Sequence, residues 1–164
     1  MKEPEEAKKC IGYLPELPPV YVDMTVGEYL QFVAELKKVP AKERREQILK
    51  VMEMTDIADM EKRLIKNLSK GYRQRVGLAQ AILGFPEVII LDEPTAGLDP
   101  RQNSEMRALI RSLAGEHTVL FSSHILSEVQ SICDRVIILH HGRIICDSAM
   151  QALRRGERRL RAVI

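Results

Sequence analysis

The chain has 164 residues, of which 45% are hydrophobic and 29% charged, and its 25 basic and 23 acidic side chains leave a formal net charge of +2. This length suits one domain with a sizeable core, and the balanced charge argues against a nucleic-acid-binding surface. The main apolar runs, 88–91 and 136–139, are far too short to span a bilayer, and the charged start MKEPEEAKKC lacks the apolar segment of a secretory signal, so we expect a cytosolic protein.

The first predicted elements are a short strand and a group of helices. Residues 11–14 have the composition of a strand, and a proline-rich loop follows them. A capping-box pattern at Thr25 and Glu28 predicts the start of a helix, and a second helix is expected after Pro40. We therefore expect residues 23–67 to form a small all-helical insertion.

The next elements alternate between helices and strands. Three continuous, β-branched runs at 88–91, 119–121 and 136–139 are typical of strands that helices cover on both faces. Between them apolar residues recur at helical spacing, and Asp99 with Pro100 suits the start of one helix. This alternation predicts an α/β fold with a parallel sheet.

The last elements are a hairpin and a basic segment. Glycine at His141-Gly142 permits the positive φ of a tight turn between two strands. After it, RRGERRLR carries five arginines, for which a solvated helix or tail is the ordinary interpretation and contact with anionic lipid headgroups the alternative. Three widely spaced cysteines without a C-x-x-C pattern indicate reduced thiols.

The stretch VIILDEPTAGLD, residues 88–99, runs from four apolar residues into two adjacent acids. Ligands of open parallel sheets bind outside the carboxyl ends of the strands, which is where Asp92 and Glu93 are expected. Asp92 is suited to hold Mg²⁺, which prefers oxygen ligands, and Glu93 is suited to accept a proton from an attacking water. A solvated loop is the ordinary alternative for an Asp-Glu pair taken alone.

The stretch LSKGYRQRVGLAQAI, residues 68–82, predicts a helix that begins after Ser69 as its N-cap. Gly71 allows close approach of another backbone, and the unpaired N–H groups of the first turn make an anion site. A capped helix is ordinary by itself. Its position 23 residues before Asp92 favours the anion site.

The stretch TVLFSSH, residues 118–124, predicts a buried strand that brings Ser122, Ser123 and His124 to the same sheet edge as the two acids. A histidine at a strand end can donate a hydrogen bond to a phosphate oxygen. A packed core histidine is the more common arrangement for such a residue taken alone.

Together and in this order, these stretches resemble the ATP-binding cassette (ABC) ATPase family over nearly the whole chain. VIILDEP resembles the Walker B motif, LSKGY the signature motif, AGLD the D-loop and SSH the switch-histidine loop, while IGYLPE falls at the Q-loop. IGYLPE and DMTVGEYL are most similar to the nucleotide-binding subunits of ABC-2-type exporters. The resemblance implies a P-loop NTPase (RecA-like) fold, a parallel sheet with helices on both faces and an ABC helical subdomain.

The resemblance also implies cofactors and residue roles. ATP and Mg²⁺ are the expected cofactors. Asp92 and Glu16 are the residues expected at the metal, Glu93 is the expected general base, and His124 is the expected contact of the γ-phosphate. The residues expected at the ATP bound by a second subunit are Ser69, Lys70, Gly71, Tyr72 and Asp99.

Two departures from the family pattern bear on these roles. Lys70 and Tyr72 stand where the commonest signature motif has glycine and glutamine, so a cation would retune the anion contact. Glu16 stands where the Q-loop usually has glutamine, which adds a charge near Mg²⁺ and is familiar in the exporter branch.

The resemblance further implies partners and an organisation. The expected partners are a second ABC ATPase subunit in a head-to-tail dimer and transmembrane permease subunits at the cytoplasmic face of the membrane, with no nucleic acid. The expected parts are a remnant of the catalytic subdomain with the Q-loop strand (1–16), a helical subdomain (17–68), the rest of the catalytic subdomain (69–150) and a basic C-terminal segment (151–164).

One motif of the family is absent from the chain. None of its glycines is followed by lysine, so there is no G-x-x-x-x-G-K-[ST] phosphate loop. Because that loop precedes the Q-loop in the family, we expect the chain to resemble the C-terminal two-thirds of a nucleotide-binding domain, with strand edges and apolar faces left uncovered.

Three functions remain open at this point. The favoured one is the ATP-hydrolysing subunit of an ABC exporter, which energises transport by ATP-driven dimerisation. The alternative is a truncated or degenerate ABC fragment that acts as a non-catalytic interaction module. A soluble ABC ATPase of translation or DNA repair is the third.

Overall fold

A computed structural model describes residues 4–154 of the chain, which fall into two compact units with a boundary between Ser122 and Ser123. Within the described residues, the first unit contains a three-stranded sheet and most of the helices, and the second contains a two-stranded sheet and two short helices. Each unit is described by itself.

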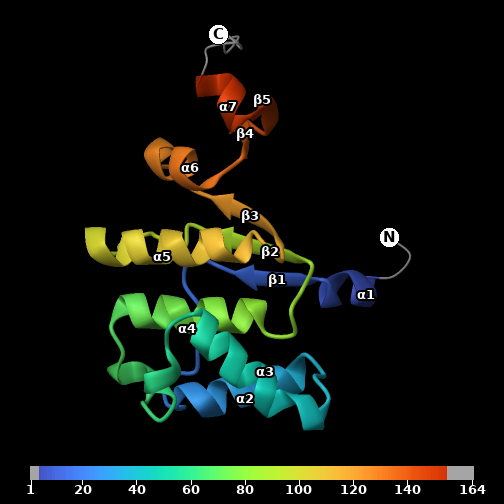
Figure 1. The fold of residues 1–164 in the computed structure, drawn as a ribbon, viewed down its shortest axis with the longest axis vertical. Coiled ribbons are helices and arrows are strands. Elements are labelled where there is room, and N and C mark those ends of the chain that lie inside the picture. The colour runs from blue at the N-terminus through green and yellow to red at the C-terminus, as the bar shows by residue number, and fades with distance from the viewer. Residues whose placement is uncertain (1–3, 155–164) are drawn as a thin grey trace. The chain divides into compact units, whose positions relative to one another are not determined.

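The sheet of the first unit is parallel. It consists of β1 (Ile11–Leu14), β2 (Val88–Asp92) and β3 (Thr118–Ser122) in the order β1-β2-β3 (Figure 1). Leu14 pairs with Leu91, and Leu91 pairs with Phe121. The predicted α/β class with a parallel sheet is confirmed, and the strands lie where the apolar runs placed them.

Two crossover helices connect these strands. α4 (Lys70–Ile82) precedes β2, and α5 (Pro100–Leu113) joins β2 to β3. Right-handed crossovers between successive neighbouring strands place both helices on the same face of the sheet. The residues on the covered face are buried, namely Leu14, Ile89 and Leu91, whereas residues on the other face are exposed, namely Ile11 (40%), Tyr13 (49%) and Leu120 (53%).

The expectation of helices on both faces therefore needs a correction for the described part of the first unit. The β-branched runs predicted strands buried on two sides, but β1 and β2 are buried on one side only, and β3, which was expected to be a buried strand, has half-buried residues on that side and exposed ones on the other. The reason is topological. A continuous apolar run shows that a strand is apolar on both sides, but the connections between strands determine on which faces of the sheet helices lie.

The segment between β1 and α4 is helical, as expected for residues 23–67. It contains α2 (Val26–Leu36), α3 (Ala41–Met54) and the 3₁₀ turns η1 (Ala58–Met60) and η2 (Ile65–Asn67). The predicted capping box is present, because the Glu28 amide donates to the Thr25 hydroxyl (3.2 Å) and the Thr25 amide donates to the Glu28 carboxylate (2.8 Å).

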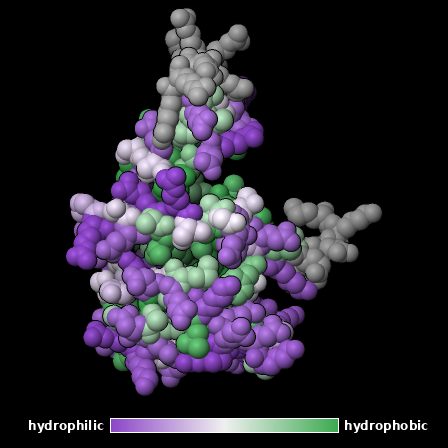
Figure 2. All heavy atoms as spheres, viewed as in Figure 1, coloured by the Kyte–Doolittle hydropathy of each residue, from purple (hydrophilic) through white to green (hydrophobic). Residues whose placement is uncertain are grey.

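α4 lies between the sheet and this helical segment, in contact with β1 on one side and with α2 and α3 on the other (Figure 1). The buried apolar residues of α3 are Ile48, Val51 and Met52, which form one face of the helix that was expected after Pro40. Hydrophilic side chains cover most of the visible surface of the helical segment (Figure 2).

The second unit contains α6 (Leu126–Ile132), the antiparallel strands β4 (Arg135–His140) and β5 (Arg143–Ala149), and α7 (Met150–Arg154). The predicted hairpin turn is confirmed, since His141 and Gly142 have φ values of 45° and 72°. The apolar residues at helical spacing on α6 are not fully buried, since Leu126 is 63% exposed and Val129 and Ile132 are half-buried. The second unit consists of a two-stranded sheet and short helices, so it offers little apolar surface against which this seven-residue helix could pack.

A short helix at the start, α1 (Pro4–Lys9), was not predicted, although a proline at the first helical position and lysines in the last turn are signals for it. The three cysteines are free. Among the described residues, no helix is long and apolar enough to cross a membrane. Most of the basic segment RRGERRLR lies outside the described residues.

Candidate functional site

The carboxyl ends of the three parallel strands lie along one edge of the sheet. Because Asp92 pairs with Ser122 in the register, the acid pair at the end of β2 lies beside the end of β3. Glu16 follows the end of β1 by two residues on the same edge and is exposed. Ligands of such sheets bind outside this edge, so the topology places three carboxylates where a ligand is expected.

Ser122 organises the acid pair. Its hydroxyl donates to Asp92 Oδ1 at 2.7 Å and accepts from the Glu93 amide at 3.0 Å. One hydroxyl therefore fixes the carboxylate of the first acid and the backbone of the second. Sequence reasoning assigned no role to Ser122 beyond its place at a strand end, and its register position opposite Asp92 is the signal that would have found it.

The chain turns sharply after Asp92. Glu93 has a φ of 45°, which is an uncommon left-handed conformation for a residue other than glycine. Such conformations persist where the surroundings hold them, and they concentrate at functional sites. Asp92 and Glu93 are both half-buried, so water and salt screen the charges of their carboxylates less than they screen charges in a surface loop.

The donor set at this edge matches Mg²⁺. Proteins bind Mg²⁺ through one or two carboxylates together with water and phosphate oxygens, and the oriented carboxylate of Asp92 is a hard oxygen ligand of that kind. Glu16 lies on the same edge. Within residues 4–154 there is no group of three or more His, Cys, Asp or Glu side chains arranged to hold a metal ion by themselves.

A second group of predicted residues lies at the start of α4. Ser69 is its N-cap, and its hydroxyl accepts from the Tyr72 amide at 3.3 Å. Lys70 is exposed, Tyr72 is half-buried and Gly71 is buried. A Cβ added to Gly71 would come within 2.8 Å of the Gln102 side chain, so this glycine allows α4 and α5 to approach closely.

The start of α5 lies against the start of α4. Asp99 is the N-cap of α5, as predicted, and accepts from the Gln102 amide at 2.9 Å. Gly97 has a φ of 67°, and the Lys70 ammonium lies against it. The signature and D-loop motifs, which the sequence placed in separate stretches, therefore share one surface.

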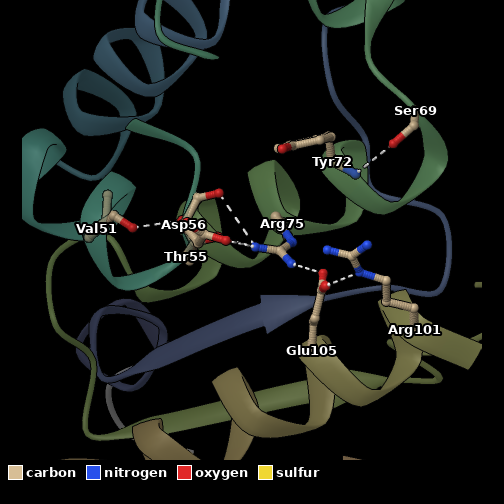
Figure 3. A network of polar contacts seen from close by, with 8 residues as sticks. All are labelled: Val51, Thr55, Asp56, Ser69, Tyr72, Arg75, Arg101 and Glu105. Carbon is tan, nitrogen blue, oxygen red and sulfur yellow. Dashed lines mark hydrogen bonds and ion pairs between the residues drawn. The ribbon is translucent and has the colours of Figure 1, made fainter. Parts of the chain in front are cut away.

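A cavity of about 400 Å³ lies beside these two helix starts, with Asp56, Arg75 and Glu105 among the residues that line it. Arg75 forms ion pairs with both Asp56 and Glu105 (Figure 3). Sequence reasoning missed this network. The signal in the sequence was the position of Arg75, a charged residue directly before Val76, which was expected on the buried face of this helix.

His124 lies in the second unit, two residues after the end of β3, and is exposed. Its neighbour Ser123 accepts from the Ile125 amide (3.1 Å) and donates to the buried Glu128 carboxylate (3.1 Å), which shapes the turn that follows β3. The predicted site residues thus form three groups: the acids and Glu16 at the sheet edge, the helix starts of α4 and α5, and the turn around His124.

Comparison with known proteins gives consistent results. The family model described as ABC transporter matches residues 1–96. An uncharacterized ABC transporter ATP-binding protein of Nostoc sp. is 43% identical over 149 residues, which are 89% of this chain and 44% of that protein. The bacitracin transport ATP-binding protein BcrA of Bacillus licheniformis is 38% identical over 160 residues, which are 96% of this chain and 51% of that protein.

A solved structure is also similar. The structure of cbiO1 from Clostridium perfringens, part of the ABC transporter complex cbiONQ, has a TM-score of 0.83 and 28% sequence identity, with 93% of this chain and 62% of that chain covered. The chain thus spans about half the length of the two curated relatives named above.

Proposed function

The chain belongs to the ABC transporter family, and we propose that it contributes the Walker B, signature, D-loop and switch-histidine parts of an ATP-hydrolysing subunit that energises an exporter. The observation that carries this proposal is the acid pair at the carboxyl edge of the sheet, where Ser122 holds Asp92 and the Glu93 backbone together. The relatives named as ATP-binding proteins support it.

Each residue at the edge has a proposed part in hydrolysis. Mg²⁺, when bound, would neutralise part of the negative charge of the phosphate groups. Asp92, oriented by Ser122, would hold it with Glu16 nearby, and Glu93 would accept the proton of the attacking water. His124 would donate a hydrogen bond to a γ-phosphate oxygen.

The N-terminal ends of α4 and α5 would contact a nucleotide that is bound by a second subunit. The Ser69 hydroxyl and the backbone at Gly71 would contact its γ-phosphate, with Lys70 adding a positive charge and Tyr72 alongside. Asp99 would help join the two subunits. We propose that the two subunits form a head-to-tail dimer on binding ATP and separate after hydrolysis.

The surface that would meet the permease lies in the loop after β1. Leu17, Tyr21 and Val22 are large apolar residues that remain exposed there. Exposed apolar groups of this kind are typical of protein interaction sites. We propose that this loop, with the helical segment 17–68, contacts transmembrane subunits at the cytoplasmic face of the membrane. The similar structure of cbiO1, part of an ABC transporter complex, supports this assignment.

The test uses a chimera in which a segment with a G-x-x-x-x-G-K-[ST] phosphate loop is fused before Met1, compared with the 164-residue chain. We expect the chimera to hydrolyse ATP and the unfused chain to show no measurable turnover, because its sequence contains no such loop. In the chimera, Glu93→Gln should lower kcat about 100-fold or more, the usual contribution of a general base.

Glu87→Gln is the matched control, since Glu87 precedes β2 at the opposite end of the same strand and is exposed. It should leave kcat within about twofold, as expected of a surface substitution away from the site. Equal rates for Glu93→Gln and the unmodified chimera would contradict the assigned base. Turnover by the unfused chain that Glu93→Gln abolishes would contradict the need for an added phosphate loop.

A further inference from the structure

Arg75 is a buried cation that joins three helices. It lies on α4, its side chain is only 10% exposed, and its guanidinium extends in two directions (Figure 3). Nη1 donates to Asp56 Oδ2 at 2.6 Å, and Nη2 donates to Glu105 Oε2 at 2.6 Å. Asp56 follows α3 and Glu105 lies on α5, so one side chain connects the helical segment, the signature helix and the helix after the D-loop.

The contact with Asp56 closes the C-terminal end of α3. Arg75 Nη1 also lies 3.5 Å from the Thr55 carbonyl oxygen and 3.4 Å from that of Asp56. A cation at the C-terminal end of a helix is stabilised by the partial negative charge of the last carbonyl groups. Asp56 has a φ of 56°, so the chain reverses at the residue that Arg75 binds.

The contact with Glu105 holds the first turns of α5. Glu105 lies on the same helix that Asp99 caps, and its second carboxylate oxygen accepts from Arg101 Nε at 3.0 Å. The close approach of Gly71 to Gln102 lies between the same two helices. The N-terminal turns of α4 and α5 therefore meet at a packed contact and at an ion pair.

We propose that Arg75 is a positioning residue that makes the end of α3, the signature helix and the D-loop move as one body. Movement of the helical segment would then reach residues 96–99 through this guanidinium, in addition to the packed contact of Gly71 with Gln102. The mechanical part of this proposal stands on the contacts above, and its consequence for turnover rests on the proposed ATPase function.

The chemistry of the link explains why arginine is needed. A guanidinium presents several N–H donors in a planar fork and can bind two carboxylates at once, whereas a lysine ammonium is a compact point charge. Removal of the cation would take the buried partner from two carboxylates at once, that of Glu105, whose side chain is 39% exposed, and that of Asp56, which is 80% exposed.

The test is amide hydrogen exchange in the 164-residue chain, measured separately over residues 51–58 and residues 96–103. Asp56→Asn removes one charge while asparagine still tolerates the left-handed backbone. We expect exchange over 96–103 to rise about tenfold in Asp56→Asn and in Glu105→Gln, because each change removes a negative charge paired with the Arg75 guanidinium, which is only 10% exposed, and local opening becomes easier.

Arg101→Gln is the matched control, because Arg101 binds the same carboxylate as Arg75 but is 89% exposed and lies on α5 itself. It should change exchange over 96–103 by less than about twofold, since exposed ion pairs contribute little. The proposal is overturned if Asp56→Asn alters only residues 51–58, or if Arg101→Gln has the same effect as Glu105→Gln. Because these variants leave Arg75 itself unchanged, they test the link between the helices even if an Arg75→Gln chain does not fold.

The consequence for turnover is measured in the phosphate-loop chimera. Asp56→Asn and Arg75→Lys should each lower kcat about tenfold while KM for ATP stays within about twofold, the pattern of a residue that acts on the assembled site and not on ATP binding. Unchanged kcat in an active chimera overturns the role in turnover. An unmodified chimera without ATPase activity refutes the proposed function instead, and the exchange result still decides the mechanical link.

Discussion

Tyr29 is a buried hydroxyl that joins α2 to α4. Its side chain is 2% exposed, and its hydroxyl donates to Gln80 Oε1 on α4. Burial, with a smaller contribution from Tyr21, raises the pKa of Tyr29 to about 12. The hydroxyl therefore keeps its proton in the folded chain at a pH where an unfolded tyrosine, with a pKa near 10, has lost it.

This shift predicts a loss of stability at alkaline pH. The contribution of Tyr29 should be fully present below pH 10 and should fall by about 1.4 kcal/mol per pH unit as the pH rises from 10 to 12, because the unfolded state releases its proton first. The measurement is the free energy of unfolding in urea from pH 8 to pH 11.5, for the unmodified chain and for Tyr29→Phe.

The difference in unfolding free energy between those two chains should stay constant up to pH 10 and then shift in favour of the phenylalanine variant. Tyr13→Phe, at the exposed face of β1, reports the effect of removing a hydroxyl elsewhere on the same unit. A constant difference through pH 11.5 would refute the assignment.

At the scale of elements, the packing of β1 against α4 depends on a glycine. A Cβ at Gly12 would approach the Ala81 carbonyl carbon to 2.9 Å and the Pro86 ring to 3.0 Å, and it would overlap the Ala81 carbonyl oxygen. The two nearest neighbours are backbone atoms of Ala81, which cannot rotate away. Helix and strand can therefore approach closely only because this position lacks a side chain.

Gly12→Ala should consequently lower the free energy of unfolding by about 2 kcal/mol or more, the cost of forcing extra volume into a packed interior. Gly115→Ala is the matched substitution in open space, where the nearest atom, the Ser112 carbonyl oxygen, lies 3.8 Å from the added Cβ. It should change stability by no more than about 0.5 kcal/mol. Urea unfolding of both variants tests the difference, and equal effects would show that β1 and α4 separate easily.

At the scale of the whole molecule, the exposed face of the first unit's sheet is a departure from a well-covered domain. Ile11, Tyr13 and Leu120 project from that face, and β1 and β3 are its outer strands. Contiguous apolar surface and open strand edges both promote association.

We therefore expect the 164-residue chain to self-associate at micromolar concentrations. Tyr13→Thr combined with Leu120→Thr should raise the monomer fraction, since threonine keeps the strand preference while removing apolar surface. Leu36→Thr, which changes an exposed leucine of α2 instead, should not. Sedimentation velocity measures the distribution, and a monodisperse unmodified monomer that melts cooperatively would contradict the expectation.

Much of the local structure was predictable because its causes are local. The cap residues Thr25, Ser69 and Asp99 were assigned correctly, since a cap is formed by residues within one turn. The acid pair was placed at a strand end because an apolar run that stops at two acids is visible in the chain. The residue roles at that edge stay predictions.

The sequence by itself thus determined most of the elements, the caps at Thr25, Ser69 and Asp99, and the strand-end acids, which depend on neighbours within a few positions. Tertiary structure alone decided the contacts between distant residues: Ser122 with Asp92, 30 residues apart, and Arg75 with Asp56 and Glu105, 19 and 30 residues apart. It also decided which face of the sheet is covered. The physical reason is that the spacing of apolar residues along the chain indicates which side of an element is apolar. Strand register and crossover direction determine which distant residues that side contacts.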